Sequence, residues 1–129
     1  MENVYEIRRE VFIREQGVPE EIEMDGLDNE AIHVLATADG VCAGCGRLLF
    51  RNGEAKMGRV AVRKDMRRMG IGDGICRLLM AIAGDNGAAR VIINAQLAAV
   101  EFYESLGFTK EGDVFLEAGI KHVRMTKAL

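Results

Sequence analysis

The sequence predicts an α/β (α+β) domain with a mixed, mostly antiparallel central sheet and flanking helices. Three segments in the middle of the chain alternate like strands, and two hairpin signals join them. The pattern then changes to helix, strand and helix between residues 70 and 108. Antiparallel strands followed by such an alternation predict helices packed against a mixed sheet.

Composition and charge narrow the class of protein. The chain has 129 residues, of which 49% are hydrophobic and 29% charged, and its net charge is −3. This length fits one domain over residues 1–129, and the composition is not that of a disordered chain. The lack of a basic excess argues against a nucleic-acid partner. No apolar run reaches the roughly 18 residues of a membrane span. We therefore expect a cytoplasmic protein that binds neither nucleic acid nor membrane.

The first half of the chain contains a helix, an acidic loop and three strands. Apolar residues recur at helical spacing from Val4 to Phe12, and Gly17 with Pro19 ends that helix. The loop over residues 20–31 contains six acidic residues, which form either a solvated surface or an attraction for a cationic amine. Asp39-Gly40 and Asn52-Gly53 are hairpin signals. The strands that they join are predicted over 32–38, 41–50 and 54–62.

The second half alternates between helices and strands. Apolar residues fall on one helical face from Gly70 to Ala83. Residues 90–95, RVIINA, form a nearly all-apolar run that is typical of a parallel strand covered on both faces. A short helix over 98–108 ends at Gly107. The remaining residues, 112–129, predict one or two closing strands.

Cys42 and Cys45 form a C-x-x-C motif, which suits either a redox pair or half of a zinc site. The motif lies in a predicted strand, where residues three apart point to opposite faces. No second C-x-x-C is present, and the histidines are distant in sequence. We therefore expect free, buried thiols and no metal site.

Residues 67–74, RRMGIGDG, place three glycines at the start of a helix. A helix N-terminus has unpaired N–H groups and a partial positive charge, and therefore binds anions. A phosphate could lie directly against Gly70, Gly72 and Gly74, which have no Cβ. Positive charge is contributed nearby by Arg63, Lys64, Arg67 and Arg68. The segment matches neither a P-loop nor a Rossmann G-x-G-x-x-G turn. It predicts a pyrophosphate site, and tight helix packing is the alternative.

Residues 60–75, VAVRKDMRRMGIGDGI, resemble the cofactor motif of the GCN5-related N-acetyltransferase (GNAT) superfamily. Its pattern, Arg/Gln-x-x-Gly-x-Gly/Ala, is matched by Arg67, Gly70 and Gly72. Residues 91–108, VIINAQLAAVEFYESLGF, resemble the second motif of the superfamily. The segments REVFIREQGVP and IKHVRM resemble its ElaA/YjcF-like branch. Such folds usually begin with a strand, and only Met1 and Glu2 precede the first helix here. Either that strand is absent or the sequence begins after it.

The resemblance implies acetyl-CoA as donor, CoA as product, and a primary amine on a small molecule or peptide as acceptor. It implies direct attack in a ternary complex, and a V-shaped split between the strand that ends at Val62 and its parallel neighbour. The pantetheine arm would lie against the former strand, and a backbone N–H near Val62 could polarise the thioester carbonyl. The expected cofactor-binding residues are Val60, Ala61, Val62, Arg67, Arg68, Met69, Gly70, Ile71, Gly72, Asp73 and Asn94.

The resemblance also maps a general acid onto Tyr103, whose alternative role is to cover the core. A base must take a proton from the ammonium form of the acceptor. Glu15 and His33 are the candidate bases, and His122 is a third. Asn94 and Gln96 could bond the pantetheine amides or the substrate. The rival function is a non-catalytic CoA-binding module of the same fold. The sequence does not determine the oligomeric state, and a homodimer is one of the alternatives.

Overall fold

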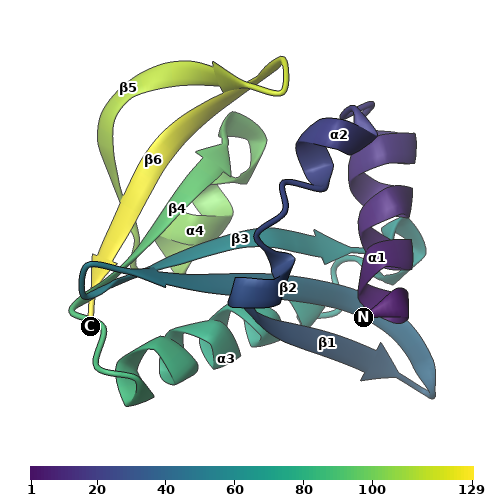
Figure 1. Cartoon of the computed structure of the whole chain (residues 1–129), viewed down its shortest axis with the longest axis horizontal. Helices are drawn as coiled ribbons and strands as arrows, with labels where there is room; N and C mark the ends of the chain where they lie inside the picture. Colours follow the sequence, from purple (N-terminus) through teal and green to yellow (C-terminus); the bar gives the residue numbers. More distant parts are fainter.

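A computed structural model describes all residues from Met1 to Leu129. One sheet of six strands runs through the molecule (Figure 1). The strands are β1 (Ile32–Ala38), β2 (Val41–Arg51), β3 (Glu54–Val62), β4 (Arg90–Gln96), β5 (Thr109–Glu117) and β6 (Ile120–Ala128). The three strands predicted in the middle of the chain are confirmed, and the closing segment contains two strands. β5 begins at Thr109, three residues earlier than predicted.

The strand order is β1-β2-β3-β4-β6-β5, and every neighbouring pair is antiparallel except β3 with β4. The parallel pairing is short. It runs only from Glu54 opposite Arg90 to Met57 opposite Ile93, after which the two strands have no common register. Figure 1 shows β3 and β4 diverging from this point. The predicted mixed sheet with a splayed parallel pair is therefore confirmed.

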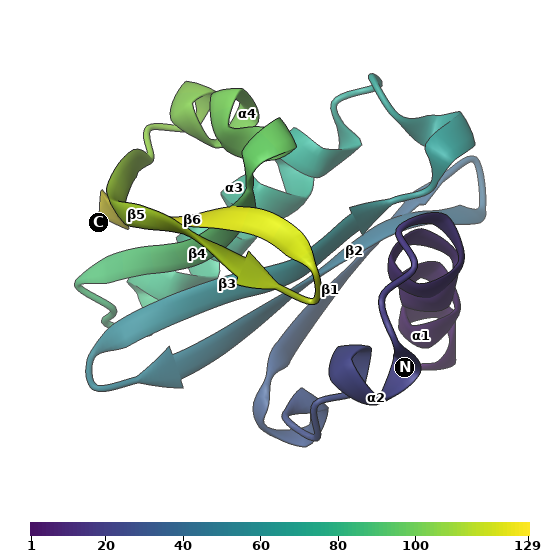
Figure 2. The ribbon, with the colours of Figure 1, turned by 90° about the horizontal axis from the view of Figure 1, so that it is seen from above.

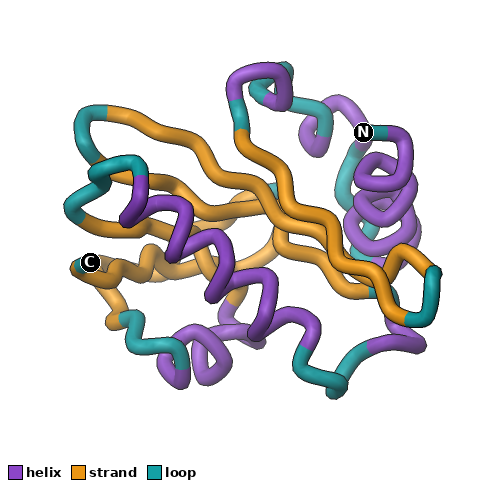
Figure 3. Tube along the Cα trace, turned by 90° about the horizontal axis from the view of Figure 1, so that it is seen from below, coloured by secondary structure: helices purple, strands orange, loops and turns teal.

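Helices lie on both sides of the sheet. They are α1 (Glu2–Arg8), which continues as the π-helix η1 (Arg9–Glu15), α2 (Glu20–Glu23), α3 (Ile71–Asp85) and α4 (Val100–Ser105). Short 3₁₀ turns are η2 (Asp28–Glu30), η3 (Lys64–Met66) and η4 (Leu97–Ala99). The view from below shows α3 lying across one face of the sheet (Figure 3). The view from above shows α1 and α2 together, beside the strands β1 to β3 (Figure 2). None of these helices has the length and apolarity needed to cross a bilayer.

The main core lies between the sheet and the helices α3 and α4. Strand side chains alternate between the two faces, so Ala55 and Met57 on β3 are fully buried in this core while Lys56 between them is exposed on the other face. Residues from β4, β6, α3 and α4 complete the same cluster. One face of the sheet is consequently apolar and covered, and the opposite face is largely polar.

Two glycines of β2 allow α3 to approach the sheet closely. A Cβ on Gly46 would lie 2.7 Å from side-chain carbons of both Ile75 and Leu79. A Cβ on Gly44 would lie 2.8 Å from the carbonyl oxygen of Ala61 and 3.0 Å from Ile75. Contacts this short would force the helix away from the sheet. No pattern in the sequence predicts this role for either glycine.

Cys42 and Cys45 both pack against a small apolar cluster under α1, not on opposite faces of a regular strand. The reason is a β-bulge: β2 places one extra residue, Ala43, between the partners of Ala36 and Thr37 on β1. Both thiols are free, and burial raises the pKa of Cys45 to about 12. The predicted free thiols are confirmed, and Cys45 is buried as predicted, but Cys42 is only half-buried and the prediction that the two point to opposite faces is wrong.

Candidate active site

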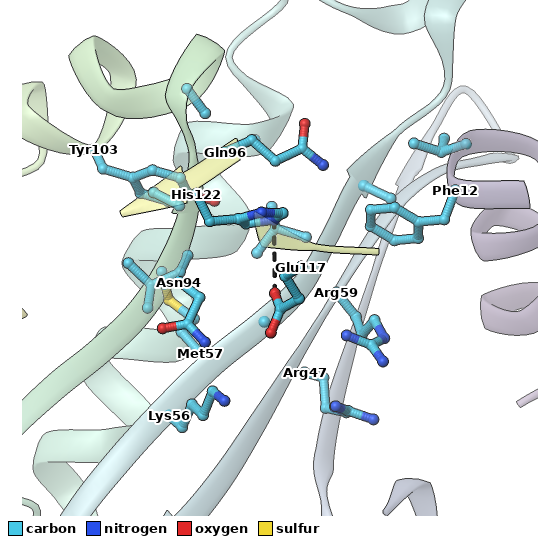
Figure 4. A pocket seen from close by; sticks show the side chains of 18 of the residues that line it. Phe12, Arg47, Lys56, Met57, Arg59, Asn94, Gln96, Tyr103, Glu117 and His122 are labelled. Atoms are coloured by element: carbon cyan, nitrogen blue, oxygen red, sulfur yellow. Dashed lines mark ion pairs between the residues drawn. The ribbon is translucent and has the colours of Figure 1, made fainter. Parts of the chain in front are cut away.

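A cleft of about 1120 Å³ lies where β3 and β4 separate (Figure 4). One end is lined by the loop of residues 67–74, called here the glycine loop. The other end is lined by Lys56, Glu117, His122 and Arg124, and is called here the acceptor end. The cleft therefore connects a helix N-terminus with the polar face of the sheet.

The glycine loop presents unpaired backbone N–H groups to the cleft. Gly70 caps α3 with a φ of 79°, in the left-handed region that glycine adopts without strain. The N–H groups of Ile71, Gly72 and Asp73 donate to no acceptor within the chain, whereas the N–H of Gly74 donates to Gly70 O at 3.0 Å. Three free donors at the positive end of a 15-residue helix suit an anion.

The two loop arginines differ in their partners. Arg67 donates from both terminal nitrogens to the Glu15 carboxylate, each at 2.7 Å, and from Nε to Val62 O at 2.9 Å. These bonds raise the pKa of Arg67 and leave its guanidinium committed to the protein. Arg68 has no carboxylate within 4.0 Å and lines the cleft, so its charge is available to a ligand.

Tyr103 on α4 reaches the cleft from the apolar side. Its ring packs edge-on against Phe102 and Phe108, with centroids 5.0 and 5.8 Å away. The residue is 7% exposed and lines the cleft, and its hydroxyl makes no hydrogen bond within the chain. Burial raises the pKa of Tyr103, which keeps the phenol protonated. The residue thus belongs to the core and also reaches the cleft.

His122 on β6 lies at the acceptor end. Its Nδ1 is 2.7 Å from the carbonyl oxygen of Ile120, and its ring stacks on Phe115. Because a carbonyl oxygen only accepts, Nδ1 must carry a hydrogen, which leaves the lone pair on Nε2 in the neutral ring. That Nε2 is 3.6 Å from the Glu117 carboxylate (dashed line in Figure 4).

Comparison with known proteins decides the family. A family model described as an acetyltransferase (GNAT) domain matches residues 2–129. The chain belongs to the GNAT acetyltransferase family. The N-acetyltransferase YjcF of Bacillus subtilis is 38% identical over 128 residues, which cover 98% of this chain and 91% of YjcF. The expected superfamily is therefore confirmed.

Solved GNAT structures agree with the fold. An N-acetyltransferase from Lactobacillus plantarum superposes with a TM-score of 0.91 at 26% identity, covering 99% of this chain and 90% of that one. An acyl-CoA N-acyltransferase from Pseudomonas aeruginosa gives 0.88 at 30% identity, covering 98% and 89%. Escherichia coli ElaA gives 0.85 at 24% identity, covering 98% and 88%.

Within this GNAT fold, the cleft gathers all but one of the predicted cofactor residues. Val60, Ala61, Val62, Arg67, Arg68, Gly70, Ile71, Gly72, Asp73 and Asn94 line it. Met69 is 64% exposed and is not part of the lining.

The two candidate bases, Glu15 and His33, do not line the cleft. Glu15 ends η1, and its hydrogen bonds from Arg67 lower its pKa, which makes it a poor base. His33 lies on β1, two strands from the split, with Nε2 2.9 Å from Asp28 O. The third candidate, His122, is the one that the structure brings to the cleft.

A hydrogen bond spans the cleft between the end of η1 and β4. Gln96 Nε2 donates to Gln16 Oε1 at 2.9 Å, 80 positions apart in sequence. Both residues line the cleft. The sequence predicts a binding role for Gln96 but none for Gln16, since only the folded chain places the two side by side.

The acidic loop does not form a simple solvated surface. Glu23, Asp25 and Asp28 form ion pairs with three arginines, Arg8, Arg47 and Arg59. Arg8 is fully buried, and its Nε donates to Glu23 Oε1 at 2.7 Å. The network ties the α2 segment to the sheet beside the cleft. Glu30 also pairs with Arg51, at 3.4 Å, so four of the six acidic residues neutralise protein arginines and have little charge left with which to attract an amine.

Proposed function

We propose that this chain transfers an acetyl group from acetyl-CoA to a primary amine. The observation that carries the proposal is the separation of β3 from β4 after Met57 and Ile93, beside three unpaired N–H groups at the start of α3. Two acetyltransferases of the same fold, an aminoglycoside 6′-N-acetyltransferase and one from Bacillus subtilis, were crystallised with coenzyme A. When bound, acetyl-CoA supplies a thioester that an amine attacks directly, with CoA as the leaving thiol.

The glycine loop fits the diphosphate of this donor. The N–H groups of Ile71, Gly72 and Asp73 would donate to phosphate oxygens, and Arg68 would contribute an unshared positive charge. Arg67 acts differently: its bonds to Glu15 and Val62 brace the loop against the protein.

The divergent part of β3 fits the pantetheine arm. Beyond Met57 this strand has β2 on one edge and no strand on the other, so its backbone groups remain available to an extended amide chain. The side-chain amide of Asn94 faces the same opening from β4. Together they would hold the donor between the two strands and aim it at the acceptor end.

His122 is the best placed base. Its Nδ1–H is held by the Ile120 carbonyl, which fixes the ring and leaves Nε2 to take the proton of an incoming ammonium. The Glu117 carboxylate, 3.6 Å from Nε2, would stabilise the resulting imidazolium. Tyr103, kept protonated by burial, would supply a proton to the departing thiolate.

Release of free thiol from acetyl-CoA, measured with a panel of amines, tests the proposal. We expect amine-dependent release, and we expect His122→Gln to lower kcat by roughly 10- to 100-fold. His33→Gln is the matched control because His33 lies outside the cleft, and its kcat should change little. Measurable CoA binding without release above background for every amine would overturn the proposal and favour a non-catalytic CoA-binding module.

A further inference from the structure

The acceptor end has a floor formed by one face of the sheet. Registers place Arg124 opposite Asn94, His122 opposite Gln96, and Lys56 opposite Ile92. Directly paired residues share a face, so these side chains project from the polar face of the sheet, away from the core. Figure 4 shows Lys56 and Asn94 toward one end of this floor and His122 and Gln96 toward the other.

The cations of the cleft differ in whether the protein neutralises them. Five arginines each have a carboxylate oxygen within 4.0 Å: Arg47, Arg51, Arg59, Arg67 and Arg124. Lys56 and Arg68 have none, and neither makes a side-chain hydrogen bond. The two unpaired cations lie at opposite ends of the cleft. Arg68 lies where the diphosphate would bind, which leaves Lys56 for a different anion.

Lys56 is exposed, but it lies on the floor of the cleft between apolar residues of the neighbouring strands. On its own face, its cross-strand neighbours are the apolar residues Leu49 on β2 and Ile92 on β4, and both are buried. All three residues line the cleft. Its ammonium has no carboxylate partner within the chain, so it is free to bind an anion that enters the cleft.

We propose that the amine acceptor carries a carboxylate, which binds Lys56, while its amine lies at His122 and Glu117. This inference rests on the proposed acetyl transfer and names the substrate class of the same site. Arg124 lies on the same floor, but its charge is paired with Glu111, whose carboxylate is 3.4 Å from Arg124 Nε. That nitrogen makes no hydrogen bond. One unshared lysine charge matches the single charge of a carboxylate better than the nearly double charge of a phosphate monoester.

The spacing of the floor limits the acceptor further. Ile92 marks the level of Lys56 along β4, and Gln96 marks the level of His122, four residues away. At about 3.3 Å per residue these levels are roughly 13 Å apart. An extended Lys56 side chain shortens this offset but does not remove it. The offset therefore favours an acceptor whose amine is several bonds from its carboxylate, and disfavours an α-amino acid.

A series of ω-amino carboxylates and their methyl esters tests the inference, since esterification removes the charge and keeps the amine. We expect kcat/KM of the acid to exceed that of its ester by roughly 3- to 10-fold in the wild type. In Lys56→Met the acid and the ester should become equivalent. The matched control is Lys110→Met, which removes an exposed lysine on β5 outside the cleft and should preserve the preference. Equal kcat/KM for acid and ester in the wild type would overturn the inference, as would an unchanged preference in Lys56→Met.

Calorimetric titration of the CoA-loaded protein separates this inference from the proposed function. Binding of the acid and the ester can be compared there without turnover. If no amine is acetylated but the acid binds more tightly than the ester through Lys56, only the proposed reaction fails. If amines are acetylated but the acid and ester bind equally, only the inference fails. Failure of every ω-amino carboxylate to bind at millimolar concentration also overturns the inference.

Discussion

Glu15 and Arg67, 52 positions apart, form a two-pronged ion pair with both N–O distances at 2.7 Å. The pair joins the end of η1 to the glycine loop, and Arg67 Nε continues the connection to Val62 O. The arginine of the cofactor motif is therefore held by the protein on one side of the loop that carries the free N–H groups. We therefore expect Glu15 to act as a positioning residue for the proposed donor site.

Replacing Glu15 with Gln should raise KM for acetyl-CoA by a few-fold and leave kcat at saturation nearly unchanged. A neutral amide cannot hold Arg67 with two charge-assisted hydrogen bonds, so the loop loses part of its preorganisation. Steady-state kinetics check this, with Glu20→Gln as control because Glu20 is exposed and forms no ion pair. A fall in kcat with KM unchanged would instead assign Glu15 to the chemical step.

Gly72→Glu should abolish CoA binding while the protein stays folded. A Cβ at Gly72 would lie 3.6 Å from Phe102 and 3.7 Å from Val62, which are ordinary contacts, so the side chain itself fits. Its carboxylate would place negative charge at the N–H groups that we propose bind the diphosphate. Calorimetric titration with CoA measures the effect. Gly84→Glu, in open space near the other end of α3, should bind CoA like the wild type.

Tyr103→Phe should lower kcat by roughly 10- to 100-fold and leave CoA affinity nearly unchanged. The substitution removes only the hydroxyl, so the contacts of the ring with Phe102 and Phe108 are kept. Parallel measurement of turnover and CoA binding tests the general-acid role. Equal losses in both quantities, or a lowered melting temperature, would indicate that the residue acts through packing alone.

Gly46→Ala should destabilise the protein by about 1–3 kcal/mol, because the added methyl group overpacks the interface between β2 and α3. The new carbon would lie 2.7 Å from Ile75 and from Leu79, both buried. Chemical denaturation measures the change. Gly58→Ala on β3 is the matched control, since a Cβ there meets nothing within 4 Å. Similar losses in both variants would point to backbone effects and not to helix approach.

Asp25→Asn should reduce stability at neutral pH by about 1–2 kcal/mol, and this difference should vanish in acid. Hydrogen bonds from Arg47 lower the pKa of Asp25 in the folded state. A lowered carboxyl pKa gives stability that is present above the unfolded value, near 3.9, and is lost as pH falls toward the folded value. Burial raises the pKa of neighbouring Glu23. The contribution of Glu23 to stability therefore decreases as pH rises, which is the opposite of the pH dependence of Asp25.

The difference in free energy of unfolding between wild type and Asp25→Asn reports on Asp25 alone, because Glu23 is present in both proteins. Denaturation curves over a pH series supply the measurement, with Glu21→Gln as an exposed control. A difference that stays constant down to acid pH would contradict the assignment of the ion pair to Asp25.

The glycine loop could be predicted from sequence because its chemistry is local. Gly70, Gly72 and the free N–H groups lie within one turn of a helix start, so eight consecutive residues describe the site. Hairpin turns and strand alternation are local in the same way, and the strands over 32–38 and 54–62 have the predicted bounds. The resemblance to the GNAT superfamily depended on these same local patterns.

The sequence offered His122 only as a third candidate base, and neither the choice among the three nor the acceptor end could be predicted, because the residues concerned come from distant parts of the chain. Glu15 and His33 were reasonable candidates by residue type, but Arg67 occupies the first and β1 holds the second away from the cleft. His122 and Lys56 meet the cleft only through strand order, with β4 inserted between β3 and β6. No spacing in the sequence reveals such a neighbour.

Short-range patterns in the chain were thus sufficient for the strands, the helix start and its anion-binding backbone, since backbone hydrogen bonding depends on residues a few positions apart. Folding assigned the partners of the charged side chains: which carboxylates neutralise arginines, which histidine reaches the cleft, and which lysine stays unpaired. Those outcomes follow from strand register and packing, which bring together residues that are tens of positions apart.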